Sequence, residues 1–280
     1  MKKLWIKVGV VVVCVFAVIG FVLVGVYIAV QLGWTKTAGI IDTQHDYFKN
    51  QSSSTGATTG STSVDMNWAQ GEEWQTLRAA ITKDVAPLNK VAAETGVPAR
   101  VIVATLVVEQ LRLFYSNREI FKKIFSPLKI LGVQSQFSWG VMGIKQDTAR
   151  QIENNLRDPL SPWYLGTKYE HTLDFPASTT DSDTERFNRL TDEHNRYYSY
   201  LYGALMIKEL ETQWEKAGFP IADKPDIIAT LFNIGFQKSK PHAGAQVGGA
   251  EIDIGSSTYS FGGLAGSFYV SDELVDIFQK

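Results

Sequence analysis

The sequence predicts a mainly α-helical domain with a small β element near its C-terminus, preceded by one transmembrane helix. Three observations predict this architecture. Residues 8–34 contain no charged side chain, residues 72–236 repeatedly carry apolar side chains at helical spacing, and residues 251–261 alternate in polarity. The 280 residues are therefore expected to divide into an N-terminus at 1–7, an anchor at 8–34, a tether at 35–66 and a domain at 67–280.

The apolar run at residues 8–34 is long enough to cross a bilayer, which takes about 20 residues. It exceeds the roughly 7–15 apolar residues of a signal-peptide core, so we expect a retained anchor. Three lysines lie within residues 1–7, which places this end in the cytoplasm. The domain is then expected on the outer, periplasmic or extracellular, face of the cytoplasmic membrane. The Ser/Thr/Gly tract at 51–63 fits a flexible tether.

Composition excludes several function classes. The net charge of −2 argues against nucleic acid as a partner, since such proteins usually carry a basic excess. The four histidines are scattered and form no His-Glu-x-x-His pair, so we expect no metal and no cofactor. Cys14 is the only cysteine and lies within the expected anchor, so the outer domain is expected to contain no disulfide.

The region from residue 72 onward predicts a series of helices. Residues 98–115 are apolar nearly all round, so we expect the central buried helix there, with Pro98 at its first position. Pro87 is expected to interrupt the helical stretch at 72–95. The remaining expectations are helices at 116–125, 146–156, 192–217 and 224–235, an exposed loop at 177–185, a hairpin at 251–261 and a loop at 262–266.

Glu109 stands inside the apolar helix expected at 98–115. An unpaired buried carboxylate is costly, or it takes up a proton. Glu109 therefore either pairs with an arginine or serves as a proton donor. Arg112, one turn along the same helix, is the nearest candidate partner, and Arg100 and Arg118 are the others.

Three segments stand in a suggestive order: "VPARVIVATLVVEQ" (97–110), "SWGVMGIKQDTA" (138–149) and "LFNIGF" (231–236). This order resembles the lysozyme-like lytic transglycosylases, which cleave the glycan of bacterial peptidoglycan. The resemblance covers residues 72–240 and implies a lysozyme-like α-helical fold, with Glu109 as the single catalytic acid and base. It also implies a substrate cleft to which six residues contribute: Ser138, Trp139, Gly140, Met142, Phe232 and Asn233.

The chain departs from the family pattern at several positions. Gln110 stands where Ser is common, Gly143 where Gln is common and Phe232 where Tyr is common. A gapped comparison would supply Gln146 as the missing Gln but would disturb the match that follows it. Residues 115–137 form an insertion after the first segment. These departures concern the sugar contacts and the bond cleaved more than the fold.

The cleft residues also have structural interpretations. Ser138 and Gly140 could only shape a turn, and Trp139 could belong to the core. Asn233 could mark an ordinary helix C-terminus, because Gly235 follows it. The tyrosines between residues 197 and 202 are expected to pack rather than to bind.

The resemblance implies a mechanism with one carboxyl group. Cleavage near neutral pH needs an acid whose pKa lies well above the reference of ~4.3, and apolar neighbours would raise the pKa of Glu109 by desolvation. The same group then acts as a base and helps the sugar's C6 hydroxyl to close an anhydro ring. A hydrolysing muramidase would instead need a second carboxylate roughly 5–9.5 Å away. Asp147, Asp174 and Asp181 are candidates, although no spacing favours them.

The expected partner is therefore the peptidoglycan glycan strand. The tether fits a local role in wall remodelling, or at envelope or secretion machinery. Two alternatives remain: a hydrolysing muramidase, and a non-catalytic glycan-binding or scaffold domain on the same fold. The Gly-rich segment at 244–263 is expected to form a flap over the cleft.

Overall fold

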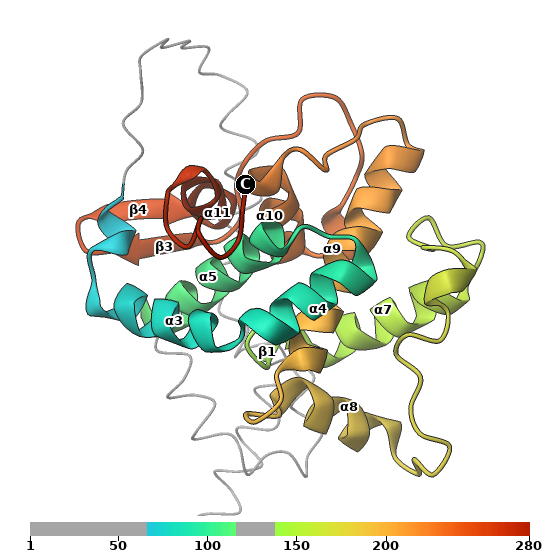
Figure 1. Ribbon diagram of the computed structural model, residues 1–280. Coiled ribbons are helices and arrows are strands. Elements are labelled where there is room, and N and C mark those ends of the chain that lie inside the picture. The colour runs from blue at the N-terminus through green and yellow to red at the C-terminus, as the bar shows by residue number, and fades with distance from the viewer. Residues whose placement is uncertain (1–65, 116–137) are drawn as a thin grey trace, which may run out of the picture. The chain divides into compact units, whose positions relative to one another are not determined.

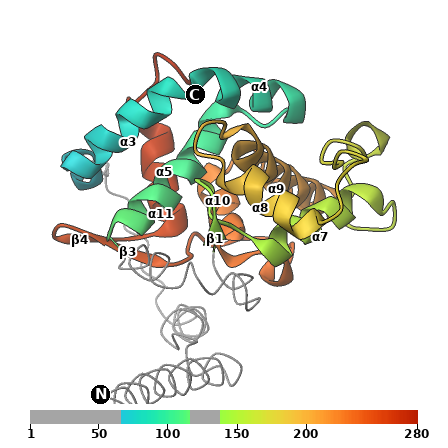
Figure 2. The same cartoon turned by 90° about the horizontal axis from the view of Figure 1, so that it is seen from below.

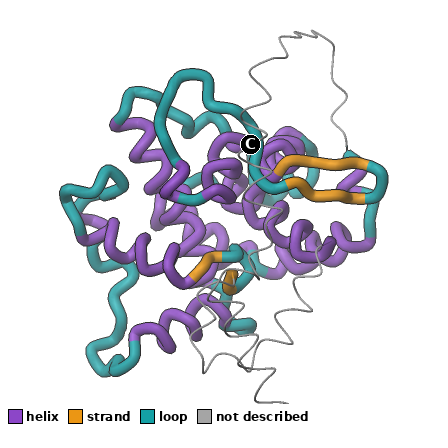
Figure 3. Tube along the Cα trace, turned by 180° about the vertical axis from the view of Figure 1, so that it is seen from behind, coloured by secondary structure: helices purple, strands orange, loops and turns teal. Residues whose placement is uncertain are grey.

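The computed structural model describes residues 66–115 and 138–280 and confirms a mainly α-helical architecture with small antiparallel β elements (Figure 1). Figure 3 shows the strands as two separate hairpins among the helices. One cluster of buried apolar side chains extends from Trp68 to Phe278. The α-helices of the described residues are α3 (Glu72–Lys83), α4 (Val85–Thr95), α5 (Ala99–Tyr115), α7 (Gln146–Arg157), α8 (Ser182–Thr191), α9 (Tyr197–Lys216), α10 (Pro225–Ile234) and α11 (Phe261–Val270), and the strands are β1 (Ser138–Trp139), β2 (Ile144–Lys145), β3 (Glu251–Ile254) and β4 (Ser257–Ser260).

The expected helical stretch at 72–95 consists of two helices, and the break lies at Asp84 rather than at Pro87. Pro87 is the third residue of α4, where its missing N–H costs no intrahelical hydrogen bond. Asp84 accepts hydrogen bonds from Tyr200 and Arg196 at the start of α9, at 2.5 and 2.8 Å. The break therefore places a carboxylate where it joins α3 and α4 to α9.

Helix α5 confirms the predicted central helix, because nearly all of its side chains from Arg100 to Leu113 are buried. It packs against α3, α4, α9, α10 and α11, and Figure 1 shows it in the middle of these helices. Its N-terminus agrees with the prediction within one residue, since the carbonyl of Pro98 accepts from the N–H of Ile102 at 3.3 Å. The apolar surface on every side of the helix is explained by neighbours on every side.

Helix α9 is the second central helix, and it begins at Tyr197 rather than at residue 192. The carboxylate of Asp192 accepts from the N–H groups of His194 and Asn195, which forms a turn before the helix. Most of α9 is buried, so it is less amphipathic than expected. As predicted, its tyrosines pack inward; the hydroxyl of Tyr202, for example, donates to Glu153 on α7 at 2.5 Å.

The expected loop at 177–185 is wrong in its second half, because α8 begins at Ser182. Asp181 caps this helix by accepting from the N–H groups of Asp183 and Thr184. Arg186 on α8 forms a buried pair with Glu153 on α7 at 2.7 Å. The view from below shows α7, α8 and α9 gathered on one side of the fold, away from the β3–β4 hairpin (Figure 2).

The C-terminal region confirms one prediction and overturns another. Strands β3 and β4 form the predicted hairpin. Residues 262–266 belong to α11 and are not a loop. A Cβ at Gly262 would lie 2.0 Å from Oγ1 of Thr230, so the glycine permits α11 to pack tightly on α10. Packing against α5 and α10 supplies the stability that this glycine-rich helix lacks by propensity.

The Gly-rich segment before β3 is attached to α10. The N–H of Gly248 donates to Oγ1 of Thr230 at 3.0 Å, and the N–H of Ala250 donates to Oδ1 of Asn233 at 2.8 Å. The backbone also bonds to α11, where the N–H of Phe261 donates to the carbonyl of Ala250. Hydrogen bonds thus attach this part of the segment to α10 and α11, while the expected flap over the cleft stays a prediction.

The expected anchor at 8–34, the expected tether at 35–66 apart from Met66, and the expected helix at 116–125 lie outside the described residues. Within residues 66–115 and 138–280, no helix is both long enough and apolar enough to cross a membrane.

Candidate active site

Glu109 lies near the C-terminal end of α5 and is 3% exposed. Val107, Val108 and Leu111 on the same helix are fully buried. The carboxylate therefore sits in the apolar surroundings that its position in the sequence predicts, and its charge has to be compensated by nearby groups.

The second expected segment forms a hairpin beside Glu109. Ser138 pairs with Lys145 and Trp139 with Ile144, and the turn between them runs from Gly140 to Gly143. The N–H of Gly143 donates to the carbonyl of Gly140 at 3.3 Å, which closes the turn. Both glycines have positive φ values, +64° and +62°, which other residues rarely adopt.

The turn contacts the Glu109 carboxylate directly. A Cβ at Gly143 would lie 1.9 Å from Oε1 of Glu109 and 2.4 Å from its Cδ. Gly143, which stands where the lytic transglycosylases commonly have Gln in the ungapped comparison, therefore faces the carboxylate. Gln146, which the gapped comparison would use, is instead the first residue of α7. A side chain at position 143 would therefore force the turn or the Glu109 carboxylate to move.

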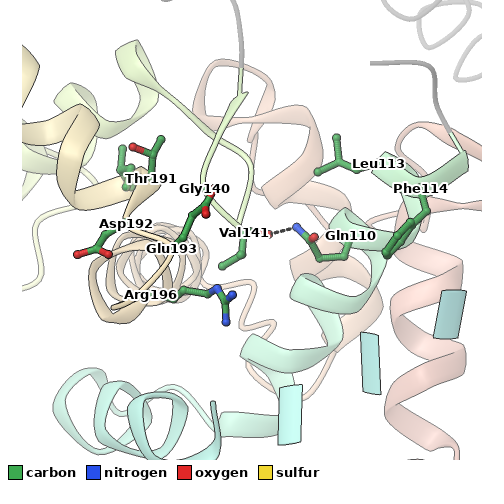
Figure 4. Close-up of a pocket in the computed structure, with 10 residues that line it drawn as sticks. Gln110, Leu113, Phe114, Gly140, Val141, Thr191, Asp192, Glu193 and Arg196 are labelled. Carbon is green, nitrogen blue, oxygen red and sulfur yellow. Dashed lines mark hydrogen bonds between the residues drawn. The ribbon is translucent and has the colours of Figure 1, made fainter. Parts of the chain in front are cut away.

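Gln110 joins α5 to the same turn. Its side-chain amide donates to the carbonyl of Val141 at 2.6 Å (Figure 4). On the opposite side, Oγ of Ser199 on α9 accepts from the N–H of Met142 at 3.3 Å. The turn is therefore bonded to both central helices. The sequence motifs did not predict the contact of Gln110 with Val141 or that of Ser199 with Met142, because each contact joins residues far apart in the chain.

Arg112 pairs with Glu109 on the same helix. Its Nη2 lies 2.5 Å from Oε1 and its Nε lies 3.1 Å from Oε2, so both carboxylate oxygens accept from one guanidinium. The two side chains are 12% and 4% exposed. This contact is the ion pair that the sequence offered as the structural interpretation of Glu109, and it favours the charged form of the carboxylate.

Two of the predicted cleft residues belong to the core. The side chain of Met142 is fully buried, and a Cβ at Gly203 of α9 would lie 2.7 Å from its Cε. Trp139 is 5% exposed and packs edge-on against Phe187, with ring centroids 4.9 Å apart. Both side chains support the hairpin from behind, so neither has a surface with which to touch a glycan.

The third segment lies at the end of α10, which packs against α5. Phe232 is 7% exposed and belongs to the core cluster. Asn233 is partly buried, and its side chain accepts from the N–H of Ala250, so it holds the segment before β3. Helix α10 ends at Ile234 with Gly235 at φ +83°. Asn233 thus has a structural role here, while α10 forms part of the surroundings of α5.

An open pocket of about 510 Å³ lies beside the turn, between α5 and the start of α9 (Figure 4). Its lining includes Gln110 and Phe114 of α5 and Gly140 and Val141 of the turn. Arg196, the residue that precedes α9, also lines it. Glu109 is not among its lining residues, so the carboxylate does not open into this pocket.

The carboxylates considered as a second acid all have local partners. Asp147 pairs with Arg150 at 3.3 Å. Asp174 binds Arg157 and His171, each at 2.8 Å, and these hydrogen bonds lower its pKa. Asp181 caps α8, and hydrogen bonds from Thr184 lower its pKa. These contacts give each carboxylate a local structural role, although the second carboxylate of a hydrolase would itself be ionised.

Comparisons of the chain with protein-family models, with curated proteins and with solved structures found no match. Among the residues that the structure describes, no group of three or more His, Cys, Asp or Glu side chains is arranged to hold a metal ion.

Proposed function

We propose that this chain is a membrane-anchored peptidoglycan lytic transglycosylase in which Glu109 is the single catalytic acid and base. One observation carries the proposal. The buried carboxylate at the end of α5 lies directly against the Gly140–Gly143 turn, so two of the three expected segments meet at the reacting group. The third segment ends a helix that packs on α5.

The reaction needs two proton transfers through one group. Glu109 donates a proton to the glycosidic oxygen as the bond between N-acetylmuramic acid and N-acetylglucosamine breaks. The resulting carboxylate then accepts the proton of the C6 hydroxyl as that oxygen closes an anhydro ring. No water is consumed and no second carboxylate is needed. Asp147, Asp174 and Asp181 are each bound by local partners, and the proposed route uses none of them.

Arg112 imposes a condition on the first step. Its guanidinium binds both oxygens of Glu109, which favours the ionised carboxylate, whereas the first step requires the protonated acid. The pair must therefore loosen when a glycan binds. Once the proton has left, the guanidinium stabilises the charge on Glu109, which assists the first step and lowers the basicity of the carboxylate in the second.

The same ion pair favours a second candidate function, a non-catalytic glycan-binding or scaffold domain. If the Glu109–Arg112 pair never opens, the carboxylate serves only to compensate the guanidinium. The absence of Glu109 from the lining of the pocket in Figure 4 agrees with this candidate.

Glu109→Gln separates the two candidates. The full-length chain in mild detergent is incubated with purified peptidoglycan, and the released fragments are identified by mass spectrometry. We expect wild type to release fragments with anhydro ends, and Glu109→Gln to lose at least 100-fold in rate, within the range expected for an acid–base residue. Glu209→Gln is the matched control, because Glu209 is a fully buried carboxyl group on α9.

The remaining outcomes are equally informative. Fragments with reducing ends would identify a hydrolysing muramidase. Equal release by wild type and Glu109→Gln would remove Glu109 from the mechanism. Binding of peptidoglycan without release by either protein would establish the binding domain instead.

The setting of the activity follows from the expected anchor at 8–34 and tether at 35–66, which would hold the domain on the outer face of the cytoplasmic membrane. A tethered enzyme acts on the wall near its own anchor. We therefore propose a local role in wall remodelling, or at envelope or secretion machinery. Labelling of a cysteine introduced into the tether with a membrane-impermeant thiol reagent in intact cells tests this orientation; absence of labelling before lysis would contradict it.

A further inference from the structure

The turn from Gly140 to Gly143 is held more firmly than a surface hairpin of two-residue strands requires. Two glycines at positive φ make its backbone intrinsically free to move. An isolated hairpin of this size is marginally stable at best. Contacts to three helices remove that freedom.

The first set of contacts comes from α8 and α9. A Cβ at Gly140 would lie 2.0 Å from the carbonyl oxygen of Leu190 and 2.5 Å from Oγ of Ser199, so this end of the turn is wedged between the two helices. Ser199 is 1% exposed and accepts from the N–H of Met142 at 3.3 Å. The side chain of Met142 then fills the space over Gly203.

The second contact comes from α5. Gln110 follows Glu109 in the sequence, so its side chain leaves the helix in a different direction and reaches the outer side of the turn. Its amide donates to the carbonyl of Val141 at 2.6 Å at the edge of the pocket (Figure 4). The hydrogen bond therefore fixes the turn to the helix that carries Glu109.

Gly143 is the residue through which the fixed turn contacts the Glu109 carboxylate. It is hydrogen-bonded to Gly140, and its Cα lies against Oε1 of Glu109. If the turn moved outward, a gap would open beside the carboxylate, and water or an altered rotamer would fill it. Proton transfer depends on the position of the acid to within a fraction of an ångström, and a displacement of about 1 Å can cost about 100-fold in rate.

We propose that Gln110 and Ser199 are positioning residues for Glu109. They hold the Gly140–Gly143 turn as a fixed wall of the carboxylate site, Gln110 from α5 and Ser199 from α9. The inference rests on the proposed function of Glu109 as acid and base. In this proposal Gln110 fixes the turn. The lytic transglycosylases that the chain resembles commonly have Ser at this position.

Gln110→Leu and Ser199→Ala test the proposal, because each removes the hydrogen bond with little change in volume. Initial rates are measured with the full-length chain over a range of concentrations of soluble glycan strands. We expect kcat to fall about 10- to 100-fold in each variant, while KM stays within about twofold, because the substrate contacts are retained. Gln110→Lys keeps a donor of similar reach and is expected to recover part of kcat.

Gln213→Leu is the matched control for Gln110→Leu. The amide of Gln213 on α9 also donates to a backbone carbonyl, that of Ser239 at 3.2 Å, and it is likewise partly buried. It is expected to keep the kcat of wild type. Hydrogen exchange measured by mass spectrometry on residues 138–145 adds a readout that needs no activity. Exchange of this peptide is expected to increase in Gln110→Leu and Ser199→Ala, and to stay unchanged in Gln213→Leu.

The results distinguish failure of this inference from failure of the proposed function. If Glu109→Gln abolishes cleavage but Gln110→Leu and Ser199→Ala keep the kcat of wild type, the positioning roles are wrong and the function stands. If exchange rises while kcat is unchanged, the two residues are only structural, which also overturns the inference. If wild type cleaves no glycan, the proposed function fails and the positioning roles fail with it.

Discussion

Gly143→Ala tests the contact on which the candidate site depends. In the structure, an added Cβ at this position would lie 1.9 Å from Oε1 of Glu109. The carboxylate cannot simply swing aside, because Arg112 binds both of its oxygens. The substitution therefore forces the turn outward or breaks the ion pair.

The expected cost has two parts. At φ +62° an alanine pays about 1–2 kcal/mol for the left-handed conformation. Overpacking of a buried site adds about 1–3 kcal/mol. The free energy of unfolding should therefore fall by roughly 2–5 kcal/mol in total. For a domain of this size, each kcal/mol lowers Tm by about 2–4 °C.

Gly96→Ala is the matched control. Gly96 follows α4 at φ +74°, and no described atom would lie within 4 Å of an added Cβ. This variant pays for the backbone conformation alone, about 1–2 kcal/mol. Because both substitutions also reduce the entropy of the unfolded chain equally, the difference between them reports the clash with Glu109.

The assay is urea unfolding of the full-length chain in mild detergent, followed by tryptophan fluorescence. Both glycine substitutions are measured in the wild-type and Glu109→Ala backgrounds. Removing the carboxylate should reduce the cost of Gly143→Ala to that of Gly96→Ala. Equal costs for the two glycine variants in the wild-type background would refute the contact. A cost at Gly143 that persists without the carboxylate would show that Glu109 is not what excludes a side chain there.

Two further substitutions test buried charges away from the site. Burial raises the pKa of Glu209 well above 4.5, and Asn155 binds only one of its oxygens. The free energy of unfolding of wild type should therefore fall by up to about 1.4 kcal/mol per pH unit as pH rises above about 4.5 towards the folded-state pKa. Glu209→Gln should lack this fall, and parallel pH profiles of the two proteins would contradict the assignment. Arg100 donates five hydrogen bonds to backbone carbonyls in residues 268–278. A lysine can donate only three, so Arg100→Lys leaves two of these carbonyls unpaired. The substitution should lower the free energy of unfolding by about 2–6 kcal/mol. The exposed Arg78→Lys is its control, and a similar small effect in both would show that the buried guanidinium contributes little.

Hydrophobic periodicity was sufficient to predict the helices whose own side chains form the core. The stretch at 98–115 is apolar on every side because α5 has neighbours on every side. Helix α10 and the β3–β4 hairpin were predicted for the same kind of reason, since their patterns record which face is buried. In these elements local propensity and tertiary packing agree.

Helix α11 was missed because its helical state comes from packing and not from propensity. The sequence "FGGLAG" contains three glycines, which predicts a loop. In the structure, Gly262 allows close approach to Thr230, and Gly266 lies near Asp226 on the same face of α10. A sequence pattern cannot distinguish glycines that loosen a chain from glycines that let two helices touch.

The candidate site was predictable only in part, for the same reason. The sequence placed Glu109 on a buried helix and named Arg112 as a partner, because both relations are local. It did not indicate that Gly143 faces Glu109, or that Ser199 supports the turn, because these contacts join segments more than 30 residues apart. Met142 and Trp139 were assigned to the cleft from their place in the motif, yet their side chains point into the core.

The buried charges in the described residues differ in the segments that they join. Arg100 ties α5 to the C-terminal residues 268–278, and the pair of Arg186 and Glu153 ties α8 to α7. Each of these contacts joins segments that would otherwise be free to separate. The pair of Arg112 and Glu109 joins residues one turn apart on a single helix, and its carboxylate also lies against Gly143 of the turn. Replacing a buried ion pair by apolar side chains is often neutral or stabilising.

The Glu109 carboxylate also restricts the residue that can stand at position 143. Gly143 occupies a left-handed conformation against Oε1, where any other side chain would force the turn or the carboxylate to move. Proteins tend to concentrate such departures from local rules at functional sites. If Glu109 and Arg112 were only a structural pair, replacing both by leucine while Gly143 is kept should leave the protein folded and its binding of peptidoglycan unchanged. Loss of glycan cleavage in a folded double variant is the outcome that the proposed function requires.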